Sequence, residues 1–450
     1  MDRLFGTDGI RGVANSELTC ELATKVGQAT ANALLKRLKK VPRIVIGCDT
    51  RMSSDMLVAA VSAGICSFGA SAITLGVVST PAVAYLTRLL NADAGVMISA
   101  SHNSFEYNGI KIFGNEGFKL SDVLEAEIES TVLGESLKNP LPCSAIGRIT
   151  NEEDGAELYL SFLKSTASAK FDGLKIAVDC ANGSASKTAE RLFTTLGARV
   201  YMLNNTPNGR NINENCGSTH TDALQKYVVD NKLDCGLAFD GDADRLLCVD
   251  EHGGLVDGDM IMAICALDMR KRKKLEKNTV VGTVMSNFGF IKFCAEQGIS
   301  FTATKVGDKF VLEEMIRGGY SLGGEQSGHI IFREFATTGD GQLTAVQLLS
   351  IMAKEGKSLF ELASVMTKSP QIIINVAASD KKKLLFSTSA VIREAIFEAE
   401  AELGNAGRII VRPSGTEPLI RVMAEGENQS FIENIAKRIS RIIDLQLGER

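Results

Sequence analysis

Three stretches of the chain share one pattern of hydrophobic and polar positions. They cover residues 43–75, 175–203 and 279–303. In each, a short apolar run leads into a polar loop, apolar residues at helical spacing, a glycine and a second apolar run. A strand, a helix that ends on glycine and a second strand are what a parallel crossover requires. The pattern therefore predicts three similar α/β domains, each built on a parallel βαβ unit.

The C-terminal part of the chain has a different pattern. It predicts a strand at 372–376, a helix over 384–403, and two strands at 408–411 and 419–423 around a tight loop. A helix follows to the end of the chain. This order is typical of an α+β domain.

Residues 136–153 contain two prolines and an acidic run, and are predicted to link the first two domains. The charged run 270–274 is predicted to be a solvated helix end. We therefore expect four domains, covering residues 1–150, 151–253, 254–369 and 370–450.

Composition narrows the class of protein. The chain has 450 residues, of which 45% are hydrophobic and 23% charged, and its formal net charge is −5. These values favour folded domains and give no support to nucleic acid or an anionic membrane as a partner. Ten cysteines without a CxxC pair or a Cys/His cluster are typical of a reducing compartment. No signal-peptide pattern or long apolar run is present, so a cytoplasmic protein is expected.

The first loop with candidate chemistry is 99–104, Ser-Ala-Ser-His-Asn-Ser, after an apolar run. Small polar residues after a strand can expose one hydroxyl. Ser101 and His102 are neighbours, and neighbours in an extended segment point to opposite sides. No G-x-S-x-G elbow is present either, so a Ser-His hydrolase is not favoured. A turn without function is the alternative.

The second loop places Asp240, Asp242 and Asp244 at alternate positions, followed by Arg245. Alternate positions of an extended loop lie on one side. Three unpaired carboxylates about 4–5 Å apart repel by several kcal/mol, and a hard divalent cation removes that cost. The alternatives are a solvated acidic turn and, with Glu251 as the twelfth position, an EF-hand. Arg245 stands where an EF-hand needs glycine, and the flanks are strand-like, so a cation beside a phosphate ligand is favoured.

The third loop is glycine-framed and polar. Its side chains offer donors and acceptors suited to sugar hydroxyls, and they come from Glu325, Gln326, Ser327 and His329. The fourth loop combines arginines, hydroxyls and a backbone nest into a plausible phosphate cradle. Its residues are Arg412, Ser414, Gly415, Thr416 and Arg421. Polar turns are the alternative for both.

Taken together, the four loops supply a hydroxyl, an acidic metal site, a sugar-binding loop and a phosphate cradle, one in each expected domain. Phosphoryl transfer to and from a sugar uses all four parts. We therefore expect the four domains to surround one central cleft.

The motifs identify a family. From end to end the chain resembles the α-D-phosphohexomutases, the phosphoglucomutase and phosphomannomutase relatives. The matching motifs are Phe5–Gly12, Ile98–Asn103 with Asn108–Lys111, Asp240–Arg245, Gly324–His329 and Arg412–Pro418. The opening motif is similar to that of the members acting on glucosamine phosphates.

The resemblance implies an isomerase that is phosphorylated on Ser101. It implies one Mg²⁺ per subunit, bound by Asp240, Asp242, Asp244 and a phosphate oxygen on Ser101. The Mg²⁺ and Arg245 would offset the charge of the transferring phosphoryl group.

The resemblance also places Lys111, Arg11 and His329 near the reacting hydroxyl. Which of them moves protons stays open. His220 is expected to be structural.

The implied reaction interconverts the 6- and 1-phosphates of glucosamine through a hexosamine 1,6-bisphosphate, which also acts as activator. It would feed amino-sugar nucleotide and cell-wall precursor synthesis. Relatives acting on glucose or mannose phosphates, the alternative substrates, usually carry Met where this chain has Gln326. Nucleic acid and membrane are not expected partners, and a monomer or a homodimer is expected.

The chain also departs from the family pattern. Unusual residues are Cys48, Ser54, Ser104 in place of Pro, Tyr107 in place of Asp, and Lys309 in place of Arg. Without Pro at position 104, the loop that carries Ser101 has more conformational freedom. This difference is expected to affect the reaction rate more than the mechanism. A catalytically silent phosphosugar-binding protein and a metal-dependent phosphatase are the alternatives from other classes.

Overall fold

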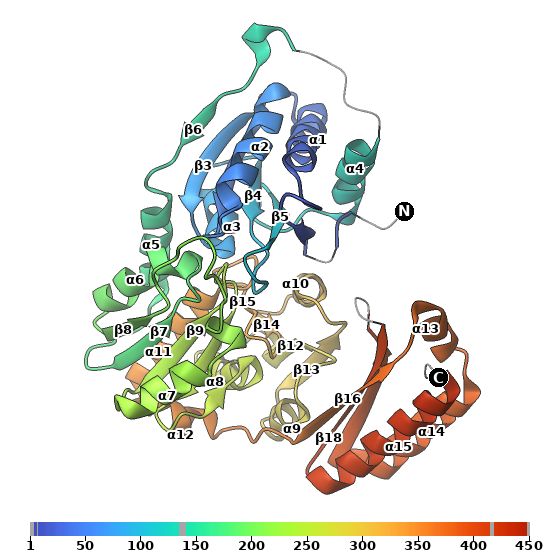
Figure 1. Cartoon of the computed structure of the whole chain (residues 1–450). Helices are drawn as coiled ribbons and strands as arrows, with labels where there is room; N and C mark the ends of the chain where they lie inside the picture. Colours follow the sequence, from blue (N-terminus) through green and yellow to red (C-terminus); the bar gives the residue numbers. More distant parts are fainter. Residues whose placement is uncertain (1–3, 7, 135–140, 415–417, 448–450) are drawn as a thin grey trace. The chain divides into compact units, whose positions relative to one another are not determined.

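The computed structural model describes residues 4–6, 8–134, 141–414 and 418–447. The chain forms two compact units (Figure 1). Unit 1 comprises Met1–Met285 and Ile299–Val365, and unit 2 comprises Ser286–Gly298 and Met366–Arg450. Three of the sheets lie in unit 1 and one lies in unit 2.

The first sheet has six strands. In spatial order they are β1 (Ile10–Val13), β5 (Tyr107–Gly114), β4 (Ala94–Ile98), β2 (Arg43–Cys48), β3 (Ser71–Val77) and β6 (Ile149–Asn151). The helices of this part are α1 (Cys20–Leu38), α2 (Ser54–Ser67), α3 (Thr80–Leu89) and α4 (Asp122–Leu133). Part of the predicted linker thus belongs to the first sheet, because Ile149 pairs in parallel with Ala72 at the edge of β3.

The second sheet has the order β11 (Leu255–Val256), β10 (Leu246–Asp250), β9 (Cys235–Phe239), β7 (Lys175–Asp179) and β8 (Arg199–Leu203). Its helices are α5 (Gly155–Thr166), α6 (Ala189–Thr195) and α7 (Asp222–Asp230). The third sheet has the order β13 (Ser300–Thr304), β12 (Thr279–Thr283), β14 (Leu322–Gly324) and β15 (Ile330–Phe332). The helices of that part are α8 (Gly258–Lys271), α10 (Asp308–Gly318), α11 (Gly341–Glu355) and α12 (Leu359–Ala363).

The three predicted parallel units are confirmed. The strand pairs β2–β3, β7–β8 and β12–β13 are each parallel. Gly69, Gly197 and Gly298 lie between the helix and the second strand with φ of 81°, 105° and 64°. A side chain with a Cβ atom rarely adopts this left-handed conformation, so glycine lets each helix end where the pattern predicts.

Unit 2 is an antiparallel three-stranded sheet with helices packed on it (Figure 1). Its strands are β16 (Gln371–Ala377), β18 (Leu419–Gly426) and β17 (Gly407–Pro413). Its helices are α9 (Phe288–Glu296), α13 (Asp380–Phe386), α14 (Ala390–Leu403) and α15 (Gln429–Leu447). An α+β arrangement was expected here and is confirmed.

The single helix predicted over 384–403 is wrong. Residues 387–389 separate α13 from α14. The Ser387 and Thr388 hydroxyls donate to carbonyls of α13, and the Ser389 hydroxyl accepts from the backbone of Ile392 at the start of α14. Three consecutive hydroxyl side chains compete with helical hydrogen bonding, which ends one helix and caps the next.

Helix α9 follows β12 in the chain but belongs to unit 2. Its first turn is held by Glu425, a fully buried carboxylate on β18. Glu425 accepts from the Phe288 backbone at 3.1 Å and from the Asn287 amide at 3.3 Å. Arg408 on β17 pairs with the same carboxylate at 2.6 Å.

All four loops singled out in the sequence connect antiparallel neighbours. They join β4 to β5, β9 to β10, β14 to β15 and β17 to β18. Over the part of the chain that the structure describes, no helix has both the length and the apolar character needed to cross a membrane.

Candidate active site

The loop between β4 and β5 meets the acidic loop between β9 and β10. The buried Ser101 hydroxyl donates a hydrogen bond of 2.6 Å to Oδ2 of Asp240. The two residues are 139 positions apart in the chain. The first two candidate loops therefore form one site.

Ser101 does not sit in an extended segment, and the expectation that its side chain points away from His102 is wrong. Its φ is +54°, and its Oγ lies 3.4 Å from Nδ1 of His102. Burial, with Arg245 and Arg11 nearby, lowers the pKa of His102 to about 4. The imidazole is therefore neutral at pH 7, and the shorter hydrogen bond of Ser101 is to a carboxylate.

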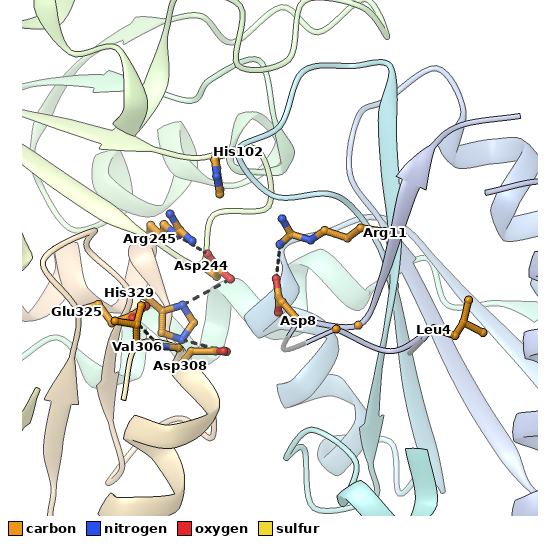
Figure 2. A pocket seen from close by; sticks show the side chains of 13 residues that line it. Leu4, Asp8, Arg11, His102, Asp244, Arg245, Val306, Asp308, Glu325 and His329 are labelled. Atoms are coloured by element: carbon orange, nitrogen blue, oxygen red, sulfur yellow. Dashed lines mark hydrogen bonds and ion pairs between the residues drawn. The ribbon is translucent and has the colours of Figure 1, made fainter. Parts of the chain in front are cut away.

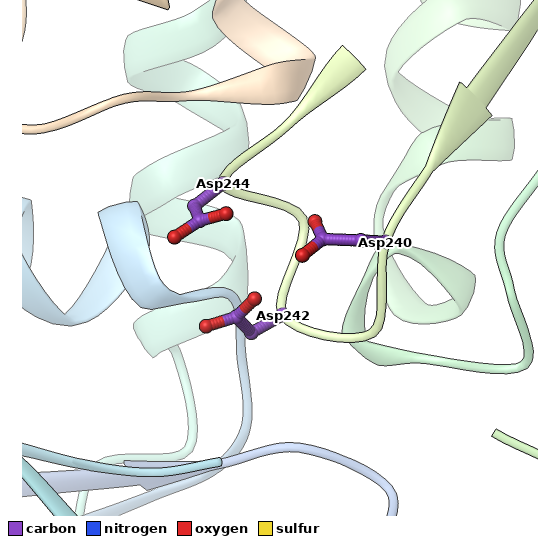
Figure 3. A group of neighbouring side chains, drawn as sticks. All are labelled: Asp240, Asp242 and Asp244. Carbon is purple, nitrogen blue, oxygen red and sulfur yellow. The ribbon is translucent and has the colours of Figure 1, made fainter. Parts of the chain in front are cut away.

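The three carboxylates of the acidic loop converge (Figure 3). One oxygen from each of Asp240, Asp242 and Asp244 lies within 4.8 Å of the others. The side chains turn together because Ala243 has φ of +54°, rather than because the loop is extended. Exposure of these residues is 6% or less, which excludes a solvated turn.

Two of these carboxylates have an oxygen without a hydrogen bond. Oδ1 of Asp242 and Oδ1 of Asp244 are buried and accept no hydrogen bond from any residue that the structure describes. Burial and the neighbouring Asp244 and Asp242 raise the pKa of Asp240 well above its ordinary value. An oxygen-only site with surplus negative charge fits a hard divalent cation.

The EF-hand alternative is wrong. The acidic loop is flanked by the strands β9 and β10 rather than by helices. Glu251, the residue at the twelfth position, accepts instead from the backbone of Phe360 at 3.2 Å.

The second oxygen of Asp242 accepts hydrogen bonds from residues of the domain that contains the first sheet. Oδ2 accepts a hydrogen bond of 2.6 Å from the Thr80 hydroxyl and one of 2.8 Å from Nζ of Lys111. The Thr80 backbone also donates to the carbonyl of Asp242. Because Oδ2 is engaged, Oδ1 is the oxygen left for a cation. Thr80 has no signal in the sequence beyond its place at the start of a helix.

Lys111 is the cation of the carboxylate cluster. It is 2% exposed, and its Nζ lies 2.8 Å from Asp242, 3.1 Å from Asp8 and 3.6 Å from Asp244. Burial alone would lower the pKa of Lys111, but Asp242 and Asp8 raise it above its ordinary value. Lys111 is therefore protonated, and its charge offsets that of the carboxylates.

A cavity of about 480 Å³ opens beside this cluster (Figure 2). Figure 2 shows Asp8 and Arg11 on one side, facing Asp244 and His329 on the other. Its polar and charged lining comes from Asp8, Arg11, His102, Asp244, Arg245, Asp308, Glu325 and His329. Of the predicted residues, Arg11, Arg245, Glu325 and His329 are thus brought together at one cavity, whereas His220 is exposed and lies elsewhere.

His329 contacts the acidic loop directly. Its Nδ1 lies 3.5 Å from Oδ2 of Asp244, and its Nε2 accepts from the Gly339 backbone at 3.0 Å. The ring proton therefore sits on Nδ1, toward the carboxylate. Asp308, which sequence reasoning did not single out, lies 3.8 Å from Nε2.

The remaining residues of the sugar-binding loop lie in one turn. Glu325 accepts from the Gly307 backbone at 3.1 Å and faces the cavity. Gln326 and Ser327 are half-buried. The Gln326 amide nitrogen donates 3.2 Å to Oδ2 of Asp257, the residue that caps α8.

The fourth loop lies in unit 2. Arg412 and Arg421 are directly opposite each other on β17 and β18. The carbonyl of Ser414 accepts from Nζ of Lys383 at 2.9 Å, which adds a third cation that sequence reasoning did not find. Gly415 and Thr416 lie outside the described residues.

Comparison with known proteins gives the family. Four models that describe the domains of phosphoglucomutase/phosphomannomutase match the chain. Domain I matches residues 2–139, domain II 157–254, domain III 257–369 and the C-terminal domain 373–442. The chain belongs to the phosphoglucomutase/phosphomannomutase family, as its motifs predicted.

Individual relatives agree with this assignment. The chain is 53% identical over 449 residues to the phosphoglucosamine mutase of Acetivibrio thermocellus, and the match covers 100% of both chains. A phosphoglucomutase/phosphomannomutase family protein from Burkholderia thailandensis has a similar structure, with a TM-score of 0.84 at 22% identity over 99% of this chain and 98% of that one. An N-acetylphosphoglucosamine mutase from Aspergillus fumigatus, solved with GlcNAc-6P and magnesium, has a TM-score of 0.70 to this chain. Its sequence identity is 18%, and the match covers 98% of this chain and 95% of that one. Both structures share the fold of this chain.

The charge balance around Lys111 generates a stability prediction. Lys111→Met removes the cation from a buried cluster and should lower the free energy of unfolding by about 3–5 kcal/mol. Urea unfolding in a chelating buffer measures this. Lys25→Met on the exposed face of α1 is the matched control. Equal stability of the two variants would contradict the charge-balancing role.

Proposed function

We propose that this protein acts as a phosphoglucosamine mutase. It interconverts glucosamine 6-phosphate and glucosamine 1-phosphate through a phosphorylated Ser101 and a glucosamine 1,6-bisphosphate intermediate. The observation that carries the proposal is the Ser101 hydroxyl, which contacts the buried acidic triad beside the cavity. The name phosphoglucosamine mutase, carried by a relative that matches the full chain, supports it.

The reaction is two phosphoryl transfers in opposite directions. In the first, the bond from phosphorus to Ser101 Oγ breaks and a bond to a sugar hydroxyl oxygen forms. The sugar hydroxyl gives up its proton to a base, and Ser101 Oγ takes up a proton to become a hydroxyl. The bisphosphate then turns around. In the second, the bond from the other phosphate to its sugar oxygen breaks and a bond from phosphorus to Ser101 Oγ forms. The Ser101 hydroxyl gives up its proton, and the sugar oxygen takes one up.

The acidic loop is proposed to hold one Mg²⁺. Oδ1 of Asp242 and Oδ1 of Asp244, which accept no hydrogen bond from any described residue, would bind it together with Asp240 and a phosphate oxygen. The ion would neutralise charge on the transferring group. Arg245 adds positive charge at the same wall of the cavity. Lys111 is held protonated by carboxylates, so it is suited to offset charge or donate a proton rather than accept one.

The sugar is proposed to be recognised by the loop from Gly323 to His329, and the phosphate that is not in transit by the loop between Arg412 and Arg421. Asp257 engages the Gln326 amide nitrogen. The Gln326 amide oxygen is then the atom available to accept from an amine at C2, and the sulfur of a methionine is a much weaker acceptor.

The sugar preference tests the proposal. Catalytic efficiency (kcat/KM) should be about 10–100-fold higher for glucosamine phosphate than for glucose phosphate, because glucose offers a hydroxyl in place of the amine. Gln326→Met should narrow this ratio. A preference for glucose or mannose phosphates would contradict the proposal and favour a phosphoglucomutase or phosphomannomutase activity.

The covalent carrier is tested by Ser101→Ala. This variant should lose turnover, because the phosphoryl group then has no acceptor on the protein. Intact mass after incubation with glucosamine 1,6-bisphosphate should show one added phosphoryl group on the wild type and none on the variant. Ser104→Ala, in the exposed part of the same loop, should behave as wild type. Steady release of inorganic phosphate by the wild type would indicate a phosphatase instead.

Metal binding is tested without turnover. Mg²⁺ at roughly 100 times its Kd should stabilise the wild type by about 2.7 kcal/mol. Asp242→Asn should lose most of that gain, since it removes one anionic ligand. Glu251→Gln, at the rejected EF-hand position, should keep it. Equal Mg²⁺ stabilisation of the Asp242 and Glu251 variants would contradict the assigned site.

A further inference from the structure

The backbone of the Ser101 loop is held by one buried arginine. The Arg51 side chain is fully buried, and its guanidinium group has five N–H donors. One donor, on Nε, pairs with Oδ2 of Asp49 at 2.8 Å. The other four donate to loop carbonyl oxygens, those of Ser101 and Asn103 at 2.9 Å, Tyr107 at 3.0 Å, and Ser104. Every donor is used.

Asp49 holds the other side of the same loop. Its Oδ2 accepts a hydrogen bond of 2.6 Å from the Ser99 hydroxyl. Oγ of Ser99 in turn accepts a hydrogen bond of 2.9 Å from the Ser101 backbone N–H. Its Oδ1 accepts from the Arg51 backbone and from the Ser54 hydroxyl, both at 3.0 Å. The amide and the carbonyl of Ser101 are therefore both anchored to one ion pair.

This anchoring matters because Ser101 has an unfavourable backbone conformation. A serine rarely adopts positive φ, because the conformation costs energy that surrounding contacts must offset. Here the conformation aims Oγ at Asp240. A second donor reinforces it, since the Asn213 amide donates 2.9 Å to the carbonyls of both Ser101 and Asn103.

We propose that Arg51, paired with Asp49, is the positioning residue that fixes the Ser101 hydroxyl for phosphoryl transfer. The inference rests on the proposed function, in which Ser101 carries the phosphoryl group. Arg51 acts through the loop backbone and does not line the cavity. The proposal also accounts for two departures from the family pattern. Ser104 and Tyr107 contribute carbonyl oxygens to Arg51, and any residue supplies a carbonyl, so the loop keeps its shape without proline at position 104.

Arg51→Lys tests the proposal. Lysine keeps the charge beside Asp49, but one ammonium group cannot reach four carbonyls. We expect kcat to fall about 100-fold with KM within about threefold of wild type, because a misplaced nucleophile slows the transfer without weakening substrate binding. Hydrogen exchange should accelerate over residues 99–107. The rate at which glucosamine 1,6-bisphosphate phosphorylates Ser101 should fall in parallel.

Arg43→Lys is the matched control. Arg43 begins β2 in the same sheet and donates to the Leu90 carbonyl, away from the Ser101 loop. It should leave kcat and loop exchange unchanged. If Arg51→Lys does not fold, Asn213→Ala tests the positioning of the loop instead, because it removes the amide that donates to the carbonyls of Ser101 and Asn103. We then expect kcat to fall about tenfold at unchanged KM.

The outcomes separate the two proposals. Wild-type kcat and wild-type loop exchange in folded Arg51→Lys would overturn the positioning role while leaving the mutase proposal intact. Failure of the wild type to take phosphate on Ser101 would overturn the mutase proposal. Loop exchange in Arg51→Lys would still report whether Arg51 orders the loop.

Discussion

Mutual repulsion among three buried carboxylates is the constraint around which the site is organised. Asp240, Asp242 and Asp244 lie too close together to be ionised at once without positive charge nearby. The structure supplies it from Lys111 and Arg245, and supplies hydrogen bonds from Thr80 and Ser101. A divalent cation would complete this balance, because one oxygen from each carboxylate lies within 4.8 Å of the others, and Oδ1 of Asp242 and Oδ1 of Asp244 accept no hydrogen bond from any described residue. Charge balance therefore joins the first two sheets of unit 1 through a single loop.

The strands of the three parallel units, their parallel pairing and the identity of the four loops could be predicted from the sequence. Each depends on local periodicity or on short motifs, which a single chain displays directly. The contacts between loops could not be predicted, since they join distant positions. Thr80 and Asp242 are 162 residues apart, and nothing near Thr80 marks it as a partner of a carboxylate. Arg51 lies between Cys48 and Ser54, which the sequence already marked as unusual for the family. Its role could not be predicted, because it depends on the direction of the carbonyl groups in the Ser101 loop.

Two of the errors have a common physical origin. Ser101 and Ala243 were treated as extended because alternation is the simplest conformation of a short polar loop. Both have positive φ instead, which tertiary hydrogen bonds impose and local sequence does not encode. The helix break at 387–389 is different, because its three hydroxyl residues were a readable signal that apolar spacing obscured.

Helix α9 shows that the boundaries of a domain along the chain and in space can differ. Its first turn is fastened to Glu425 of the C-terminal sheet, although it follows β12 in the chain. A chain shortened after residue 369 would leave Asn287 and the Phe288 amide without that carboxylate. Exchanging the C-terminal domain between two relatives would likewise require matching residues near position 287, so the two segments are expected to change together during evolution.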